Sequence, residues 1–120
     1  MSYYTEFSLN ILEADKKWRD HIENEIEKMN VFTDGNYEDG YFAYEKWYDF
    51  DKDMRLLSTR FPGTVFELEG IGEEIDDHWL HYYKGGRVMR NGIEIIRHQF
   101  DESKLEGKIC VDEGQLYSYE

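Results

Sequence analysis

The sequence has 120 residues, with 27 Asp or Glu against 14 Lys or Arg, so its formal net charge is −13 and its pI is about 4.6. A chain of this length builds one hydrophobic core, and its hydrophobic fraction of 40% and aromatic fraction of 17% argue against disorder for most of it. The negative field repels phosphates, which argues against direct nucleic-acid binding, and it attracts basic protein surfaces. The alternative on composition alone is that the charge serves only solubility.

The first segment alternates in character and predicts a strand over residues 3–11 with one buried face. Tyr3, Thr5, Phe7 and Leu9 point to one side, and Tyr4, Glu6, Ser8 and Asn10 to the other.

The next segment has helical spacing. Asp15 is a good N-cap, and Trp18, Ile22, Ile26 and Met29 follow at intervals of four, four and three residues. This spacing predicts an amphipathic helix whose apolar stripe faces the core.

A loop and a second strand are expected next. Turn formers and carboxylates dominate residues 34–40, and the aromatic run at 41–48 follows.

A second helix is predicted after this strand. Phe50, Met54, Leu57 and Phe61 recur at intervals of four, three and four, either Asp49 or Asp51 can cap the start, and Pro62-Gly63 ends the run.

The second half of the chain predicts mainly strands. Residues 64–70 and 78–83 are the third and fourth strands, joined by an acidic connection. The pairs Gly85-Gly86 and Asn91-Gly92 tolerate positive φ and predict hairpin elements within 87–99. From residue 101 onward the periodicity weakens, so residues 101–120 are expected to be a loose tail, or to add an edge strand at 109–111 or 116–119.

This order of elements predicts one α+β domain over residues 1–120. We expect a ferredoxin-like antiparallel sheet with two helices on one face and extra C-terminal strands. The expected core has a helical side and a sheet side, made of Trp18, Ile22, Ile26, Met29, Phe50, Met54, Leu57 and Phe61 against Phe7, Leu9, Phe66 and Leu68.

The densest group of metal-ligand types lies at residues 73–78. Its spacing does not match a calcium loop, which needs alternating acidic residues, a central glycine and a distal Glu. His78 and His81 are three apart on a predicted strand, so they point to opposite faces and cannot share one ion. We therefore expect no metal site.

The sequence also lacks the pattern of an enzyme or of a cofactor site. Cys110 lies in the weakly periodic tail, and no Ser sits in a glycine-flanked elbow. Gly70-Ile71-Gly72 lacks the third glycine of a dinucleotide fingerprint and precedes carboxylates that would repel a phosphate. We expect no catalytic residues and no cofactor.

The cellular location follows from cysteine usage and hydropathy. A single cysteine cannot form an internal disulfide, and the first residues have no basic region followed by an apolar stretch. No apolar run approaches the roughly 18 residues that span a bilayer. We expect a cytoplasmic protein.

Aromatic residues of two predicted strands offer a binding surface. Alternation places some of Trp47, Tyr48, Trp79, Tyr82 and Tyr83 on the face opposite the helices, while about half belong to the core. Exposed aromatics bordered by carboxylates are typical of a surface that binds a basic protein.

A tryptophan-bearing strand, a helix ending in Ser, a Phe-Pro pair and an acidic strand follow one another in the second half of the chain. The residues are Glu45-Lys46-Trp47-Tyr48-Asp49, Asp53-Met54, Leu57-Ser58, Arg60-Phe61-Pro62-Gly63, Phe66-Glu67-Leu68-Glu69-Gly70-Ile71-Gly72-Glu73-Glu74, Asp77-His78-Trp79, Tyr82-Tyr83-Lys84-Gly85-Gly86 and Phe100-Asp101-Glu102-Ser103-Lys104-Leu105. In these features residues 45–105 resemble small uncharacterised proteins of phages and mobile elements that are similar to the YubB-type ferredoxin-like family. The resemblance implies an origin in a phage, prophage or plasmid, where small acidic proteins often inhibit host defence complexes.

The expected function is therefore that of an acidic inhibitor, in particular an anti-CRISPR protein that occupies the basic groove of a nucleic-acid-handling effector in the host cytoplasm. The alternatives are a phage accessory or assembly module and, last, a metal-dependent or small-molecule enzyme. The expected partner contacts lie in two acidic loops and on one strand, namely Asp34, Glu38, Asp39, Glu73, Glu74, Asp76 and Asp77, with Trp79 or Tyr82 as aromatic anchor.

Overall fold

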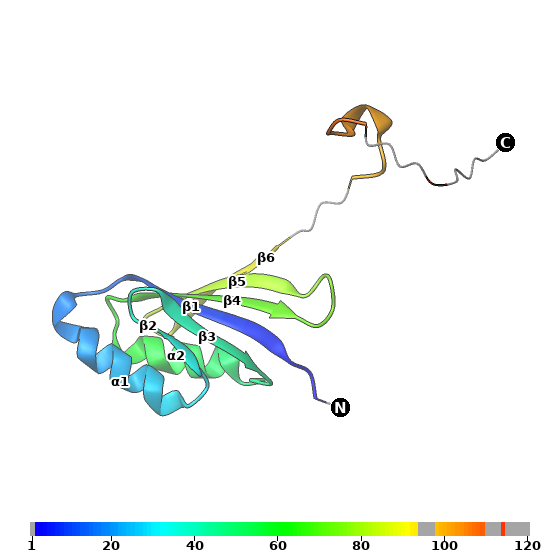
Figure 1. The fold of residues 1–120 in the computed structure, drawn as a ribbon. Helices are drawn as coiled ribbons and strands as arrows, with labels where there is room; N and C mark the ends of the chain where they lie inside the picture. The colour runs from blue at the N-terminus through cyan, green and yellow to red at the C-terminus, as the bar shows by residue number, and fades with distance from the viewer. Residues whose placement is uncertain (1, 94–97, 110–113, 115–120) are drawn as a thin grey trace.

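The computed structural model describes residues 2–93, 98–109 and 114 (Figure 1). It contains one six-stranded sheet, two α-helices and two short 3-10 helices. In chain order these are β1 (Thr5–Glu13), η1 (Lys16–Trp18), α1 (Arg19–Met29), β2 (Asp34–Asn36), β3 (Gly40–Glu45), α2 (Phe50–Arg60), β4 (Val65–Gly72), β5 (His78–Lys84), β6 (Arg87–Gly92) and η2 (Glu102–Lys104).

Every strand pair in the sheet is antiparallel, and the strand order is β2-β3-β1-β4-β5-β6. Strand β1 lies between β3 and β4, so these two run parallel to each other with β1 between them, and α2 makes the crossover. Both helices lie on the same side of the sheet (Figure 1). The predicted α+β class, antiparallel sheet and pair of helices on one face are therefore confirmed, with more strands than expected.

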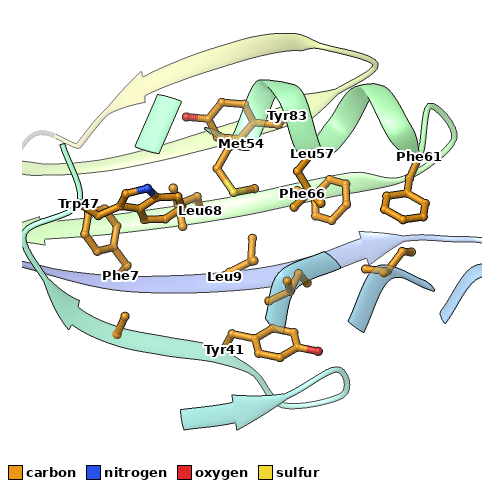
Figure 2. Close-up of a cluster of buried hydrophobic side chains, with 13 residues drawn as sticks. Phe7, Leu9, Tyr41, Trp47, Met54, Leu57, Phe61, Phe66, Leu68 and Tyr83 are labelled. Carbon is orange, nitrogen blue, oxygen red and sulfur yellow. The ribbon is translucent and has the colours of Figure 1, made fainter. Parts of the chain in front are cut away.

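The core fills the space between the helices and one face of the sheet (Figure 2). Phe7, Leu9, Phe66 and Leu68 contribute the sheet side, as the alternation predicts. The helical side contains the predicted Ile22, Ile26, Met54, Leu57 and Phe61, with Met29 and Phe50 partly buried against it. Each buried aliphatic or aromatic side chain stabilises the fold by about 1.5–3 kcal/mol relative to leaving it exposed.

Trp18 departs from the predicted core. Its side chain is 44% exposed, because Asp15 caps the short helix η1 through the backbone N–H of Lys17, and α1 begins only at Arg19. The change from a 3-10 turn to an α-helix rotates Trp18 off the stripe that Ile22 and Ile26 continue.

The segment predicted as a loop at 34–40 also differs, because its first three residues form strand β2 and pair with β3. The aromatic strand then ends at Glu45 rather than continuing to residue 48. The strand is short because Trp47 turns into the core and α2 begins at Phe50, with Asp49 at its N-cap.

The β5–β6 hairpin turns at Gly85-Gly86, where both φ angles are positive, at 57° and 80°. This pair fits the two-residue turn that the sequence predicts. Helix α2 holds the turn, since Ser58 Oγ accepts the Gly86 N–H at 2.8 Å and Arg55 Nε donates to the Gly86 carbonyl at 2.9 Å. The edge strands suggested at 109–111 and 116–119 fall almost wholly outside the described residues.

Candidate protein-binding face

Side chains alternate along each strand, so the sheet has an inner face toward the helices and a second face, called the outer face here. Within the part of the chain that the structure describes, no helix covers the outer face (Figure 1). The register places on it Tyr4, Glu6, Ser8, Asn10, Asp34, Phe42, Tyr44, Val65, Glu67, Glu69, Ile71, His78, Leu80, Tyr82, Lys84, Arg87, Met89 and Asn91. The two basic residues, Lys84 and Arg87, pair with each other beside the β5–β6 turn.

Three carboxylates lie on the two central strands of this face. Glu69 accepts a hydrogen bond from His78 at 3.0 Å when Nε2 carries the proton, and Glu67 accepts one from Asn10 at 3.4 Å. A further hydrogen bond to Glu67 raises the pKa of Tyr82, with desolvation as the next cause. The side chain of Glu6 forms neither a hydrogen bond nor an ion pair with any described residue.

Large apolar side chains surround these carboxylates. Phe42 is 44% exposed, Tyr44 56%, Ile71 40% and Met89 59%. Together with the partly buried Tyr82 they form a surface that is apolar and acidic at once. Exposed apolar side chains gathered on one face mark candidate protein-binding sites.

The first acidic loop lies at the turn between β2 and β3. Glu38 forms an ion pair with Arg19 of α1 at 3.2 Å, so its negative charge is partly neutralised within the chain. Asn36 Oδ1 accepts the backbone N–H groups of Glu38 and Asp39, and its amide donates to Asp39 at 3.1 Å. Asp34 accepts the N–H of Gly35 at 2.8 Å. The loop acids therefore also shape the turn itself.

The second acidic loop, between β4 and β5, divides into two pairs. Glu73 accepts the Tyr4 N–H at 2.9 Å, and Asp77 accepts the Tyr3 hydroxyl at 2.6 Å, which raises the pKa of Tyr3. The side chains of Glu74 and Asp76 are exposed. Glu73 and Asp77 thus hold the N-terminal segment against the loop.

The two loops do not lie together. Tyr41 pairs with Leu9 and Gly72 pairs with Thr5, so the first loop lies near the far end of β1 and the second near its start. Four residues of strand alone separate these ends by about 13 Å. The turn acids Glu38 and Asp39 therefore lie at the opposite end of the outer face from the second loop, whereas Asp34, the first residue of β2, lies between them beside Phe42.

Of the two expected aromatic anchors, only Tyr82 lies on the outer face. Trp79 faces the helices and stacks on Phe50, with ring centroids 4.5 Å apart and planes 14° apart. Trp79 is partly buried, whereas Trp47 and Tyr83 are buried (Figure 2), and Trp47 Nε1 donates to Asp53 at 2.7 Å. Trp79 is therefore a packing residue, which corrects its expected place on the binding surface.

His78 and His81 lie on opposite faces of β5, as the sequence predicts. Among the described residues, no group of three or more His, Cys, Asp or Glu side chains is placed to hold a metal ion. None of the described helices has the length and apolar character to cross a membrane.

Five residues of the outer face were not among the expected partner contacts, namely Glu6, Phe42, Tyr44, Glu67 and Glu69. Alternation in the first strand already separates Glu6 from the buried side, so the signal for this residue was present. For the other four, the necessary information is the strand order, which places their strands beside β1.

The fold and this face define the chain as an α+β protein with an open, acidic and aromatic sheet surface. No family model matches the chain, and no curated protein or solved structure matches it significantly.

Proposed function

We propose that this chain is a non-catalytic protein-binding inhibitor whose outer face and flanking acidic loops cover a basic surface of a nucleic-acid-handling protein. The observation that carries the proposal is the uncovered outer face, where Glu6, Glu67 and Glu69 alternate with exposed aromatic and aliphatic side chains. Carboxylates placed on a rigid sheet present negative charge at fixed spacing, as a phosphate backbone does. The apolar side chains add the desolvated contacts that stable protein interfaces need.

Charge decides the class of partner. With a net charge of −13 the chain is repelled by nucleic acid and attracted to proteins that hold it. Attraction of this kind raises the association rate and weakens as salt screens it. The acidic loops extend the negative surface beyond both ends of the sheet, with Glu74 and Asp76 free to contact a partner at one end.

The particular role we propose is that of an anti-CRISPR protein of a phage or plasmid, acting in the host cytoplasm. The resemblance of residues 45–105 to proteins of mobile elements supports this origin. Steric and electrostatic competition with the guide or target nucleic acid would be the whole mechanism, since it requires neither a metal nor a cofactor.

We also propose that the domain is of the ferredoxin-like class. In its favour, β1, α1, β2, β3, α2 and β4 follow one another as β-α-β-β-α-β, and the four strands lie in the antiparallel order β2-β3-β1-β4. Strands β5 and β6 would then be an addition to the β4 edge.

The test uses purified CRISPR effectors of the main types, each assayed for binding of labelled target DNA in the presence of the full chain. We expect at least one effector to lose DNA binding, and higher salt to relieve the inhibition. The double variant Glu67→Gln/Glu69→Gln should need roughly tenfold more protein for the same effect, because charge-assisted contacts are lost.

The matched control is Glu102→Gln/Glu106→Gln, which removes the same charge from exposed positions outside the sheet. It should inhibit like the unmodified chain. If no effector is inhibited and the protein is instead recovered in purified virions, the proposal is wrong and the assembly module takes its place.

A further inference from the structure

Glu6 lies at the centre of a distinctive part of the outer face. Its neighbours across the two adjoining strands are Tyr44 on β3 and Ile71 on β4. Directly opposed side chains in a sheet have Cβ atoms about 4.5–5.5 Å apart, so Tyr44 and Ile71 border the carboxylate on both sides. Glu6 is itself exposed, and its carboxylate carries no hydrogen bond or ion pair to a described residue.

Two shallow hollows meet at Glu6 and Tyr44. The larger, of about 270 Å³, also touches Phe42 and Asp34, and the smaller, of about 120 Å³, also touches Tyr4 and Glu73. Neither is lined by a Lys or Arg. Small-molecule sites usually measure about 300–1,000 Å³, so these hollows are of the size for single side chains.

The aromatic ring that separates the hollows is held in place. Tyr4 and Tyr44 meet edge to face, with ring centroids 5.1 Å apart and planes at 85°. Tyr4 is fixed in turn by its backbone N–H, which donates to Glu73 at 2.9 Å. A fixed ring beside a free carboxylate is a preorganised site for a cation, because the ring face attracts positive charge and the carboxylate pairs with it.

We propose that this site, called the Glu6 site, binds an arginine side chain of the partner protein. The inference rests on the proposed function and specifies the chemistry of its central contact. Arginine fits better than lysine, because its planar guanidinium can stack on Tyr44 and donate two parallel hydrogen bonds to Glu6 at the same time. The carboxylates of Asp34 and Glu73 reinforce the preference for a cation.

The direct test is titration of the isotope-labelled full chain with acetylated, amidated Gly-Arg-Gly, monitored by amide NMR shifts. The counterpart with Lys in place of Arg keeps the positive charge without the planar guanidinium, and the counterpart with Gln has no charge. We expect saturable shifts in β1 and β3 that are largest for the Arg peptide, smaller for Lys and absent for Gln. Equal shifts with the Arg and Gln peptides would overturn the proposal.

Variants locate the site. Glu6→Gln should weaken binding of the Arg peptide roughly tenfold, since the charge-assisted pair is lost. Tyr44→Leu should weaken it about threefold, because it keeps an apolar side chain but removes the ring. Glu13→Gln is the matched control, since it removes one charge from an exposed position at the other end of β1. If Glu6→Gln and Glu13→Gln behave alike, the Glu6 site is wrong.

The same variants separate this inference from the proposed function. Effector inhibition that survives Glu6→Gln would overturn the site and leave the inhibitor role standing. Arg-specific binding at Glu6 without inhibition of any effector would support the site and contradict the inhibitor role.

Discussion

The indole ring of Trp79 on β5 lies against the backbone of its cross-strand partner Gly70 on β4. A Cβ atom at residue 70 would lie 2.1 Å from Cζ2 of this ring. The absence of a side chain at Gly70 makes room for the indole, whose far side stacks on Phe50. This is why Trp79 belongs to the packing of the domain and not to its binding face.

Gly70→Ala is therefore expected to destabilise the fold by about 1–3 kcal/mol, as overpacking of a core does. Chemical denaturation measures the effect. Gly92→Ala is the matched strand control, because nothing lies within 4 Å of a Cβ there. A Gly70→Ala variant as stable as Gly92→Ala would show that the indole does not occupy this space.

Leu57 and Leu56 offer a second matched pair on α2. Leu57 is buried in the core, whereas Leu56 is 54% exposed. Leu57→Ala should cost about 2–5 kcal/mol through lost burial and the cavity left behind. Leu56→Ala should change the free energy of unfolding by less than about 0.5 kcal/mol. Comparable losses from both variants would mean that α2 is rotated from the orientation described.

Periodicity predicted the buried stripes well, because a helix or strand that packs on one core must repeat its apolar side chains at its own period. It could not place Trp18, whose direction depends on a 3-10 turn before α1. Nor could it place the two acidic loops relative to each other. Their separation follows from the pairing of Leu9 with Tyr41 and of Thr5 with Gly72, which is a matter of strand order.

On the candidate binding face, too, alternation predicted only part of the arrangement. Alternation placed Tyr82 and Trp79 on different sides of β5, but the sequence alone left open which side met the helices. Three-dimensional packing settles that choice, since Trp79 fills the space over Gly70. The alternating pattern of β4 likewise left open what lay beside Glu67 and Glu69.

The second acidic loop should respond unequally to neutralisation. Glu73→Gln/Asp77→Asn weakens the hydrogen bonds that hold Tyr3 and Tyr4, so we expect a lower melting temperature. Glu74→Gln/Asp76→Asn removes two exposed like charges and should leave the melting temperature unchanged or slightly higher. Thermal unfolding of the two double variants at equal ionic strength makes the comparison. Identical shifts would contradict the structural role of the first pair.

A polar chain that runs from the core to the surface links β5, α2 and β6. The Tyr83 hydroxyl donates to Asp51 at 3.0 Å, and Arg90 donates to the other oxygen of Asp51 at 2.8 Å. His81 Nδ1 lies 3.1 Å from the same hydroxyl, so it must carry the proton and donate to the Tyr83 oxygen. Burial is the main cause that lowers the pKa of His81. The negative charge of Asp51 raises this pKa, and the positive charge of Arg90 lowers it by a smaller amount.

The sign of the resulting pH dependence is fixed. The folded pKa of His81 lies below its ordinary value of 6.5, so the unfolded chain takes up this proton first. The stability that the neutral ring contributes is complete above pH 6.5 and is lost as the pH falls through the folded pKa. His81→Gln should therefore show a smaller loss of unfolding free energy between about pH 7 and pH 5 than the unmodified chain. His21→Gln, at an exposed position on α1, should retain the full loss. Parallel pH profiles for His81→Gln and the unmodified chain would contradict the buried, neutral state of His81.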